Sequence, residues 1–167
     1  SQPIGFCVQP QFIEGVRLLE RYGFSFDICI NHLQLGNAIE MVRQCPNVSF
    51  ILDHIGKPDI KGRLHEPWKT ELRELSRMPN VYCKVSGMVT KSDTESWKRE
   101  DLKPYIDHVI ESFGPDRVVF GGDWPVVLRA ARYTEWVEAL EWAVSGATQT
   151  ELRKLFRDNA VSFYRLG

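Results

Sequence analysis

The sequence has no surplus of charge of either sign and no long apolar run. Its 167 residues carry 21 Lys and Arg against 22 Asp and Glu, which gives a formal net charge of −1. A general nucleic-acid-binding protein carries a basic surplus or a basic stripe, so nucleic acid is not an expected partner. No segment approaches the ~18 apolar residues of a membrane span, and residues 1–6 lack the basic and apolar parts of a secretion signal. We therefore expect a globular cytoplasmic protein that binds no membrane.

Closely spaced cysteine pairs are also absent. The four cysteines are Cys7, Cys29, Cys45 and Cys83, and no two of them form a CxxC motif. A zinc ribbon needs such pairs. Cys29 and Cys83 lie in apolar runs that are typical of strands. Because intracellular cysteine usually behaves as a small hydrophobic residue, we expect reduced thiols that are buried or half-buried.

The glycine-rich motifs of nucleotide-binding proteins are missing as well. Neither GxGxxG nor GxxxxGK[ST] follows a predicted strand, which disfavours the common dinucleotide- and phosphate-binding folds. What the chain does contain is an alternation of short β-rich runs and longer segments with helical spacing. The predicted strands are Phe24–Ile30, Val48–Leu52, Val81–Val85 and Val118–Phe120.

Proline-containing turns separate helical segments from three of these strands, at Pro46, Pro79 and Pro115. Proline ends a helix, and the Asn or Asp after it supports the turn. The last predicted helix, 151–164, follows a capping box at Thr148. Repeated βα units imply a parallel sheet with right-handed crossovers, either a small doubly wound sheet or part of a barrel. The other helices are predicted within residues 12–22, 38–42, 68–75, 102–113 and 136–144.

Three of the predicted strands run into polar motifs that suit a hydrolytic site: DHIGKP, KVSG and GGDWP. Imidazole can bind a metal or transfer a proton near neutral pH, and a carboxylate can take a proton from an attacking water. Ligands of parallel α/β proteins bind at the carboxyl ends of the strands. We therefore expect His54, Lys84, Ser86 and Asp123 to lie at the same edge of one sheet.

Each motif also has a simpler structural explanation. The Asp-His pair is compatible with a hydrogen-bonded cap, and Gly-Gly-Asp is a common turn. Lys84 lies inside an apolar strand, where it more often pairs with a carboxylate, because an unpaired buried ammonium is costly. Strand alternation predicts that Leu52 shares a face with His54, and that Tyr82 and Ser86 share a face with Lys84.

The segments FDICINHLQLGNAIEMVRQCPNVSFILDHIGKPDI, NVYCKVSGMVT and FGPDRVVFGGDWPVV together resemble the amidohydrolase-related lactonases, the group of L-fuconolactonases and L-rhamnonolactonases. The resemblance runs from about Phe12 to Leu166. It implies an α/β fold in which residues 1–167 are a partial amidohydrolase-like domain, the C-terminal part of a (β/α)₈ TIM barrel with about strands five to eight. A complete barrel takes about 250 residues, so a missing N-terminal half is implied.

The resemblance further implies a hydrolase that opens a sugar-acid lactone, an aldonolactone, by attack of water. His54 would orient the lactone carbonyl or help to hold one divalent metal ion, zinc or manganese. Asp123 would be the general base and a second metal ligand, and it would pass the proton to the leaving hydroxyl. Lys84 and Trp124 would line the substrate pocket. The implied partner is a small-molecule sugar lactone.

The histidines depart from the family pattern. The family carries a pair of catalytic histidines, His-x-His or a variant, at the end of strand one, and no two histidines here are two residues apart. His32 is expected in a loop just past the first strand. His65 is expected in an exposed loop, and His108 on the exposed side of its helix.

Three alternatives stay open at this point. The chain could be a non-catalytic half-barrel that pairs with a second copy or another subunit, because the open edge of its first strand exposes unpaired backbone groups. It could belong to a barrel decarboxylase of an aromatic or pyrone acid, since similar barrels serve both reactions. It could be a flavodoxin-like sheet, in which helices would cover both faces.

Overall fold

A parallel four-stranded sheet forms the centre of the computed structural model, which describes residues 2–167. The register aligns Ile28 with Leu52 and Leu52 with Cys83, so the carboxyl ends of the strands meet at one edge. All four predicted strands are confirmed, although the first is shorter than the predicted Phe24–Ile30. The strands are β1 (Ser25–Ile28), β2 (Ser49–Leu52), β3 (Val81–Val85) and β4 (Val118–Phe120).

Helices alternate with the strands, as the apolar spacing predicts. The helices are α1 (Pro10–Tyr22), α2 (Leu35–Gln44), α3 (Trp68–Ser76), α4 (Arg99–Phe113), α5 (Tyr133–Ala143), α6 (Gln149–Arg153) and α7 (Asn159–Tyr164). The capping box is confirmed, since the Glu151 carboxylate accepts the backbone N–H of Thr148 at 2.7 Å. The predicted last helix is interrupted by a π-helical turn at Lys154–Asp158. Within residues 2–167, no helix is both long and apolar enough to cross a membrane.

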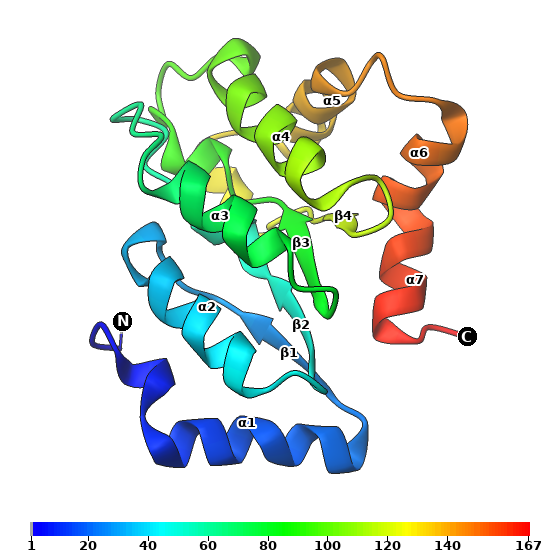
Figure 1. Cartoon of the computed structure of the whole chain (residues 1–167). Coiled ribbons are helices and arrows are strands. Elements are labelled where there is room, and N and C mark those ends of the chain that lie inside the picture. The colour runs from blue at the N-terminus through cyan, green and yellow to red at the C-terminus, as the bar shows by residue number, and fades with distance from the viewer. Residues whose placement is uncertain (1) are drawn as a thin grey trace.

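The sheet has a thick apolar layer on one face and a small cluster on the other. Helices α1 to α5 cover the first face (Figure 1), where Phe50 and Leu52 are fully buried in the main core. On the opposite face, Ile51 and Val119 pack against Phe163 of α7. Side chains of β2 therefore alternate between the helical layer and the face that α7 reaches.

The order of the strands separates the two fold classes that the sequence left open. In a doubly wound sheet the strand order reverses at a switch point, whereas in a (β/α)₈ barrel it follows the chain. Here the order is β1-β2-β3-β4, and within residues 2–167 only the end of the chain, around Phe163, packs on the second face. The fold is part of a (β/α)₈ barrel, and the flavodoxin-like alternative is wrong.

Two sequence-based expectations about buried polar residues need correction. His108 is not on the exposed side of α4: it is 3% exposed, and its Nε2 lies 2.8 Å from the carbonyl oxygen of Lys69 in a hydrogen bond. Burial lowers the pKa of His108 despite that hydrogen bond. Cys45 and Cys83 are buried free thiols, as expected, but Cys29 is exposed because it lies just beyond the end of β1. His65 is exposed, as predicted.

Candidate active site

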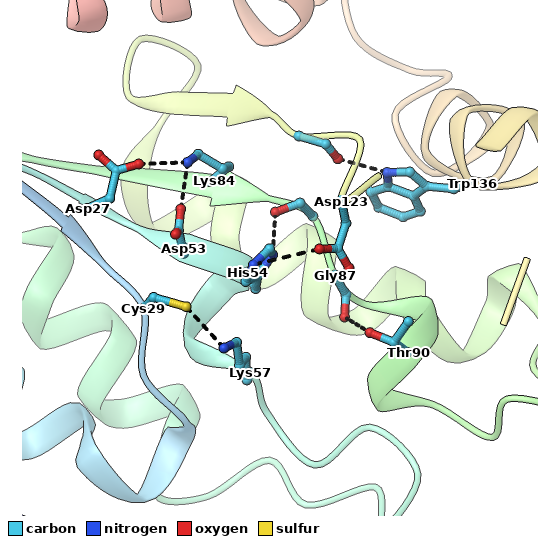
Figure 2. Close-up of polar contacts among 12 residues, drawn as sticks. Asp27, Cys29, Asp53, His54, Lys57, Lys84, Gly87, Thr90, Asp123 and Trp136 are labelled. Carbon is cyan, nitrogen blue, oxygen red and sulfur yellow. Dashed lines mark hydrogen bonds and ion pairs between the residues drawn. The ribbon is translucent and has the colours of Figure 1, made fainter. Parts of the chain in front are cut away.

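A cavity of about 390 Å³ lies at the carboxyl edge of the sheet. His54 follows β2, Gly87 and Thr90 follow β3, and Asp123 follows β4. Figure 2 shows the side chains of His54 and Asp123 directed toward one another. The polar motifs that end three strands therefore meet in one place, as the sequence predicts. The other lining residues are Lys57, Lys91, Thr94, Val126 and Arg129.

The backbone turns sharply where β2 and β4 end. His54, Ile55 and Lys57 have φ angles of 54°, 50° and 51°, and Asp123 has a φ angle of 51°. Left-handed geometry costs an L-residue about 1–2 kcal/mol, and it persists where the surrounding structure enforces it, often at functional sites. The turn at His54 also breaks the strand alternation. Leu52 points into the helical core while His54 faces Asp123, so the prediction that they share a face is wrong.

The imidazole of His54 is held on one side and open on the other. Its Nδ1 makes a hydrogen bond of 2.8 Å with Oγ of the fully buried Ser86. Its Nε2 lies 3.8 Å from Oδ1 of Asp123. Burial lowers the pKa of His54, outweighing the opposing effect of Asp123 and Asp53. The pKa of His54 therefore lies below its usual value, and Nε2 faces the cavity.

Two glycines allow the backbone to approach these side chains closely. A Cβ atom at Gly87 would lie 2.6 Å from Nδ1 of His54, and Gly87 has a φ of 65°. A Cβ atom at Gly121 would lie 2.8 Å from Cβ of Ser86. The indole N–H of Trp136 donates to the carbonyl oxygen of Gly121 at 2.9 Å (Figure 2). A side chain at either glycine would displace the imidazole or its serine partner.

Lys84 forms a network of charges on the sheet face opposite the main core. Its Nζ lies 2.9 Å from Oδ2 of Asp27 and 2.6 Å from Oδ1 of Asp53, and the Tyr164 hydroxyl donates to Asp27 at 2.8 Å. Burial lowers the pKa of Lys84, but hydrogen bonds with Asp53, Tyr164 and Asp27 outweigh burial and hold the pKa above its usual value. Lys84 therefore links β1, the turn that follows β2, and α7 through its contacts with Asp27 and Asp53.

The Lys84→Met variant is expected to unfold more easily, by about 3 kcal/mol, because it leaves the Asp53 carboxylate without its partner in a partly buried position. Urea denaturation measures this change. Lys103→Met is the matched control, since Lys103 pairs with Asp107 at the surface, where such a pair contributes at most about 1 kcal/mol. Equal losses in both variants would contradict a structural role for the Lys84 network.

The residues around His54 fit a divalent metal ion. Cys29, Asp53 and His54 each offer one ligand atom, and these atoms lie within 4.8 Å of one another. The 3.8 Å between Nε2 of His54 and Oδ1 of Asp123 is less than twice a zinc–ligand bond of about 2.0–2.2 Å, so one ion could contact both. Thiolate, imidazole and carboxylate are all zinc ligands, and carboxylates also suit manganese.

The structure groups the predicted site residues into two sets. His54 and Asp123 lie together at the cavity. Lys84 and Trp124 are not among the residues that line it: Lys84 is engaged with Asp27 and Asp53, and the Trp124 residue is 70% exposed. Their role in binding substrate stays a prediction.

Sequence reasoning missed several residues near the site. Asp53 precedes His54 in the DHIGKP motif, and Asp27 is the only charged residue of the run FSFDICI, so both had a visible signal. Lys91 and Arg129 had none, because they end two helical turns that are too short to show a period. They line the cavity because the two turns pack against each other beside the carboxyl ends of the strands.

The fold and the site define a class: α/β-barrel proteins whose functional groups lie at the carboxyl ends of the strands. Comparison with known proteins gives the family within that class. The family model described as Amidohydrolase matches residues 8–166. The chain belongs to this family.

Individual relatives are similar over nearly the whole chain. An uncharacterised protein of Sinorhizobium fredii is 33% identical over 94% of this chain and 52% of its own length. An L-fucono-1,5-lactonase of Burkholderia multivorans is 32% identical over 96% of this chain and 58% of its own length. The crystal structure of a Burkholderia multivorans amidohydrolase with bound zinc has a TM-score of 0.92 and 31% identity, over 96% of this chain and 59% of that one. The chain thus spans little more than half the length of these relatives.

Proposed function

We propose that the protein opens the ring of a sugar-acid lactone by adding water, with Asp123 as the general base. The observation that carries this proposal is the Asp123 carboxylate, which faces the imidazole of His54 across 3.8 Å in a cavity at the strand ends. Ester hydrolysis needs a base for the water and a group that stabilises charge on the carbonyl oxygen. The similarity to an L-fucono-1,5-lactonase also supports it.

In the proposed reaction, a water oxygen attacks the lactone carbonyl carbon while Asp123 takes a proton from that water. The tetrahedral intermediate then breaks the bond between the carbonyl carbon and the ring oxygen. Asp123 returns its proton to that ring oxygen, which becomes a hydroxyl, and the product is an open-chain hydroxy acid. The hydrogen bond of Nδ1 to Ser86 fixes the ring of His54 so that Nε2 faces Asp123 in the cavity.

Nε2 of His54 and the Asp123 carboxylate would hold one divalent metal ion, zinc or manganese. Such an ion would polarise the carbonyl group and lower the pKa of bound water. Metal content of the intact protein, measured by plasma mass spectrometry, tests this part. We expect about one ion per chain, and less in a His54→Ala variant. A metal content near zero in the active protein would contradict it.

Hydrolysis of a panel of aldonolactones by the intact protein tests the function itself. Acid release at constant pH is expected for at least one lactone of the panel. The same protein is offered aromatic and pyrone acids, with carbon dioxide as the readout. Carbon dioxide release without lactone opening would favour the decarboxylase alternative over our proposal.

The location and assembly of the enzyme are proposed from its thiols and from the open edge of its sheet. Free thiols at Cys45 and Cys83 support a cytoplasmic location. β1 is at one end of the sheet, and hollows of about 480 and 540 Å³ along it are lined by Phe12 and Phe26. We propose that another strand covers this edge, contributed by the missing half of the barrel or by a second copy of the chain, because unpaired edges are usually protected.

A further inference from the structure

The cavity at the strand ends carries an excess of positive charge. Lys57, Lys91 and Arg129 line it, and Asp123 is the only carboxylate among the lining residues. Within residues 2–167, none of these three cations has a carboxylate within 4.0 Å. The neighbouring Lys61, by contrast, lies outside the lining and pairs with an aspartate. The positive charge is therefore concentrated in the cavity and has no carboxylate partner among the described residues.

The fold brings these cations together from the segments that follow three different strands. Lys57 follows β2, Lys91 ends the short helical turn after β3, and Arg129 ends the short helical turn after β4. The two turns contact each other. The backbone N–H of Lys61 donates to the carbonyl oxygen of Lys91 at 2.9 Å. The backbone N–H of Val127 donates to the backbone carbonyl oxygen of Asp123 at 2.8 Å. These backbone contacts anchor the two turns beside the cavity.

Two of the three cations are free to bind a ligand. Nζ of Lys57 already lies 3.1 Å from Sγ of Cys29 (Figure 2). In the part of the chain that the structure describes, the side chains of Lys91 and Arg129 make no hydrogen bond. Unpaired charges of one sign around a hollow raise the local concentration of the opposite ion and favour its binding. A neutral aldonolactone would leave both of these charges unused.

We infer that the substrate is the lactone of a sugar diacid, an aldarolactone, whose free carboxylate is bound by Lys91 and Arg129. This inference rests on the proposed lactone hydrolysis and narrows its substrate class. Guanidinium binds a carboxylate through two parallel hydrogen bonds, and ammonium adds a point charge. Thr90 and Thr94 also line the cavity. The Thr90 hydroxyl donates to the carbonyl oxygen of Gly87 at 3.0 Å and can still accept a hydrogen bond from a sugar hydroxyl, and the Thr94 hydroxyl can donate or accept one.

The test compares an aldonolactone with the aldarolactone of the same configuration and ring size, using the intact protein. We expect kcat/KM to be higher for the aldarolactone and to fall as ionic strength rises from about 0.01 M to 0.15 M, because salt screens exposed charges. Lys91→Met and Arg129→Met should each lower the ratio of the two kcat/KM values about tenfold, the usual scale for a lost hydrogen bond to a charged group. Lys61→Met, which removes a charge outside the lining, should leave the ratio unchanged.

A ratio near one in the natural protein, or equal losses for both lactones in the two variants, would overturn the inference and leave lactone hydrolysis standing. If neither lactone is hydrolysed, the proposed function fails, and binding decides the inference separately. Titration calorimetry then measures the affinity for the aldarolactone of two proteins, the Asp123→Asn variant and the double variant that also carries Lys91→Met. Binding that Lys91→Met weakens about tenfold supports the anion site, and binding that it leaves unchanged overturns it.

Discussion

Asp123→Asn is expected to lower kcat for lactone hydrolysis by about 10²- to 10⁴-fold, the usual contribution of a general base. Asparagine has nearly the same shape as aspartate, but its amide cannot take a proton from water. His54 is the nearest alternative base, and burial already lowers its pKa, so it would remove the proton from water poorly. The measurement is kcat and KM with the best lactone of the panel, with folding checked by circular dichroism.

Asp93→Asn is the matched control for this prediction. Asp93 pairs with Lys61 at the surface and does not line the cavity, so the same substitution there should leave kcat within about twofold. An Asp123→Asn protein that retains more than a tenth of the natural rate would show that another group activates the water.

Gly87→Ala is expected to have the second largest effect, a loss of about 10²-fold in kcat/KM. The added Cβ atom would lie 2.6 Å from Nδ1 of His54, where no real Cβ fits, so the imidazole must move away from Ser86 and Asp123. A displacement of about 1 Å in a catalytic group can cost about 10²-fold in rate. The left-handed backbone of Gly87 adds a cost of about 1–2 kcal/mol in stability for any other residue.

Two readouts separate these consequences. Urea denaturation reports the loss of stability, and kcat/KM measured well below the unfolding midpoint reports the displaced imidazole. Gly146→Ala is the control, because a Cβ atom there meets nothing within 4 Å. A folded Gly87→Ala protein with activity close to that of Gly146→Ala would mean that the position of His54 is unimportant for the reaction.

The meeting of His54 and Asp123 at one edge of the sheet could be predicted because local chemistry and strand geometry point the same way. His54 and Asp123 each follow an apolar run that ends in a polar motif, and parallel strands in chain order must bring such ends to one edge. The direction in which the His54 side chain points could not be predicted. Strand alternation assumes extended backbone, and the left-handed residues His54 and Ile55 leave that region.

Residues without a periodic pattern escaped prediction for a different reason. Lys91 and Arg129 are ordinary loop cations in the sequence, and they become part of one cavity only because two turns pack on each other. The prediction that His108 is exposed was wrong because the helices packed against α4 decide which of its faces is buried. Its ring is buried against Trp68 of α3, a contact that the α4 sequence does not encode.

By itself, the sequence determined the four strands, most of the helices, the family and the two strand ends that carry His54 and Asp123. These features follow from short-range propensities and from the hydrophobic period, which each segment carries within itself. Only the tertiary structure decided that Lys84 is engaged with Asp27 and Asp53, while Lys91 and Arg129 line the cavity and make no ion pair within residues 2–167. Charge pairing depends on distances between residues far apart in the chain, and those distances exist only once the elements have packed.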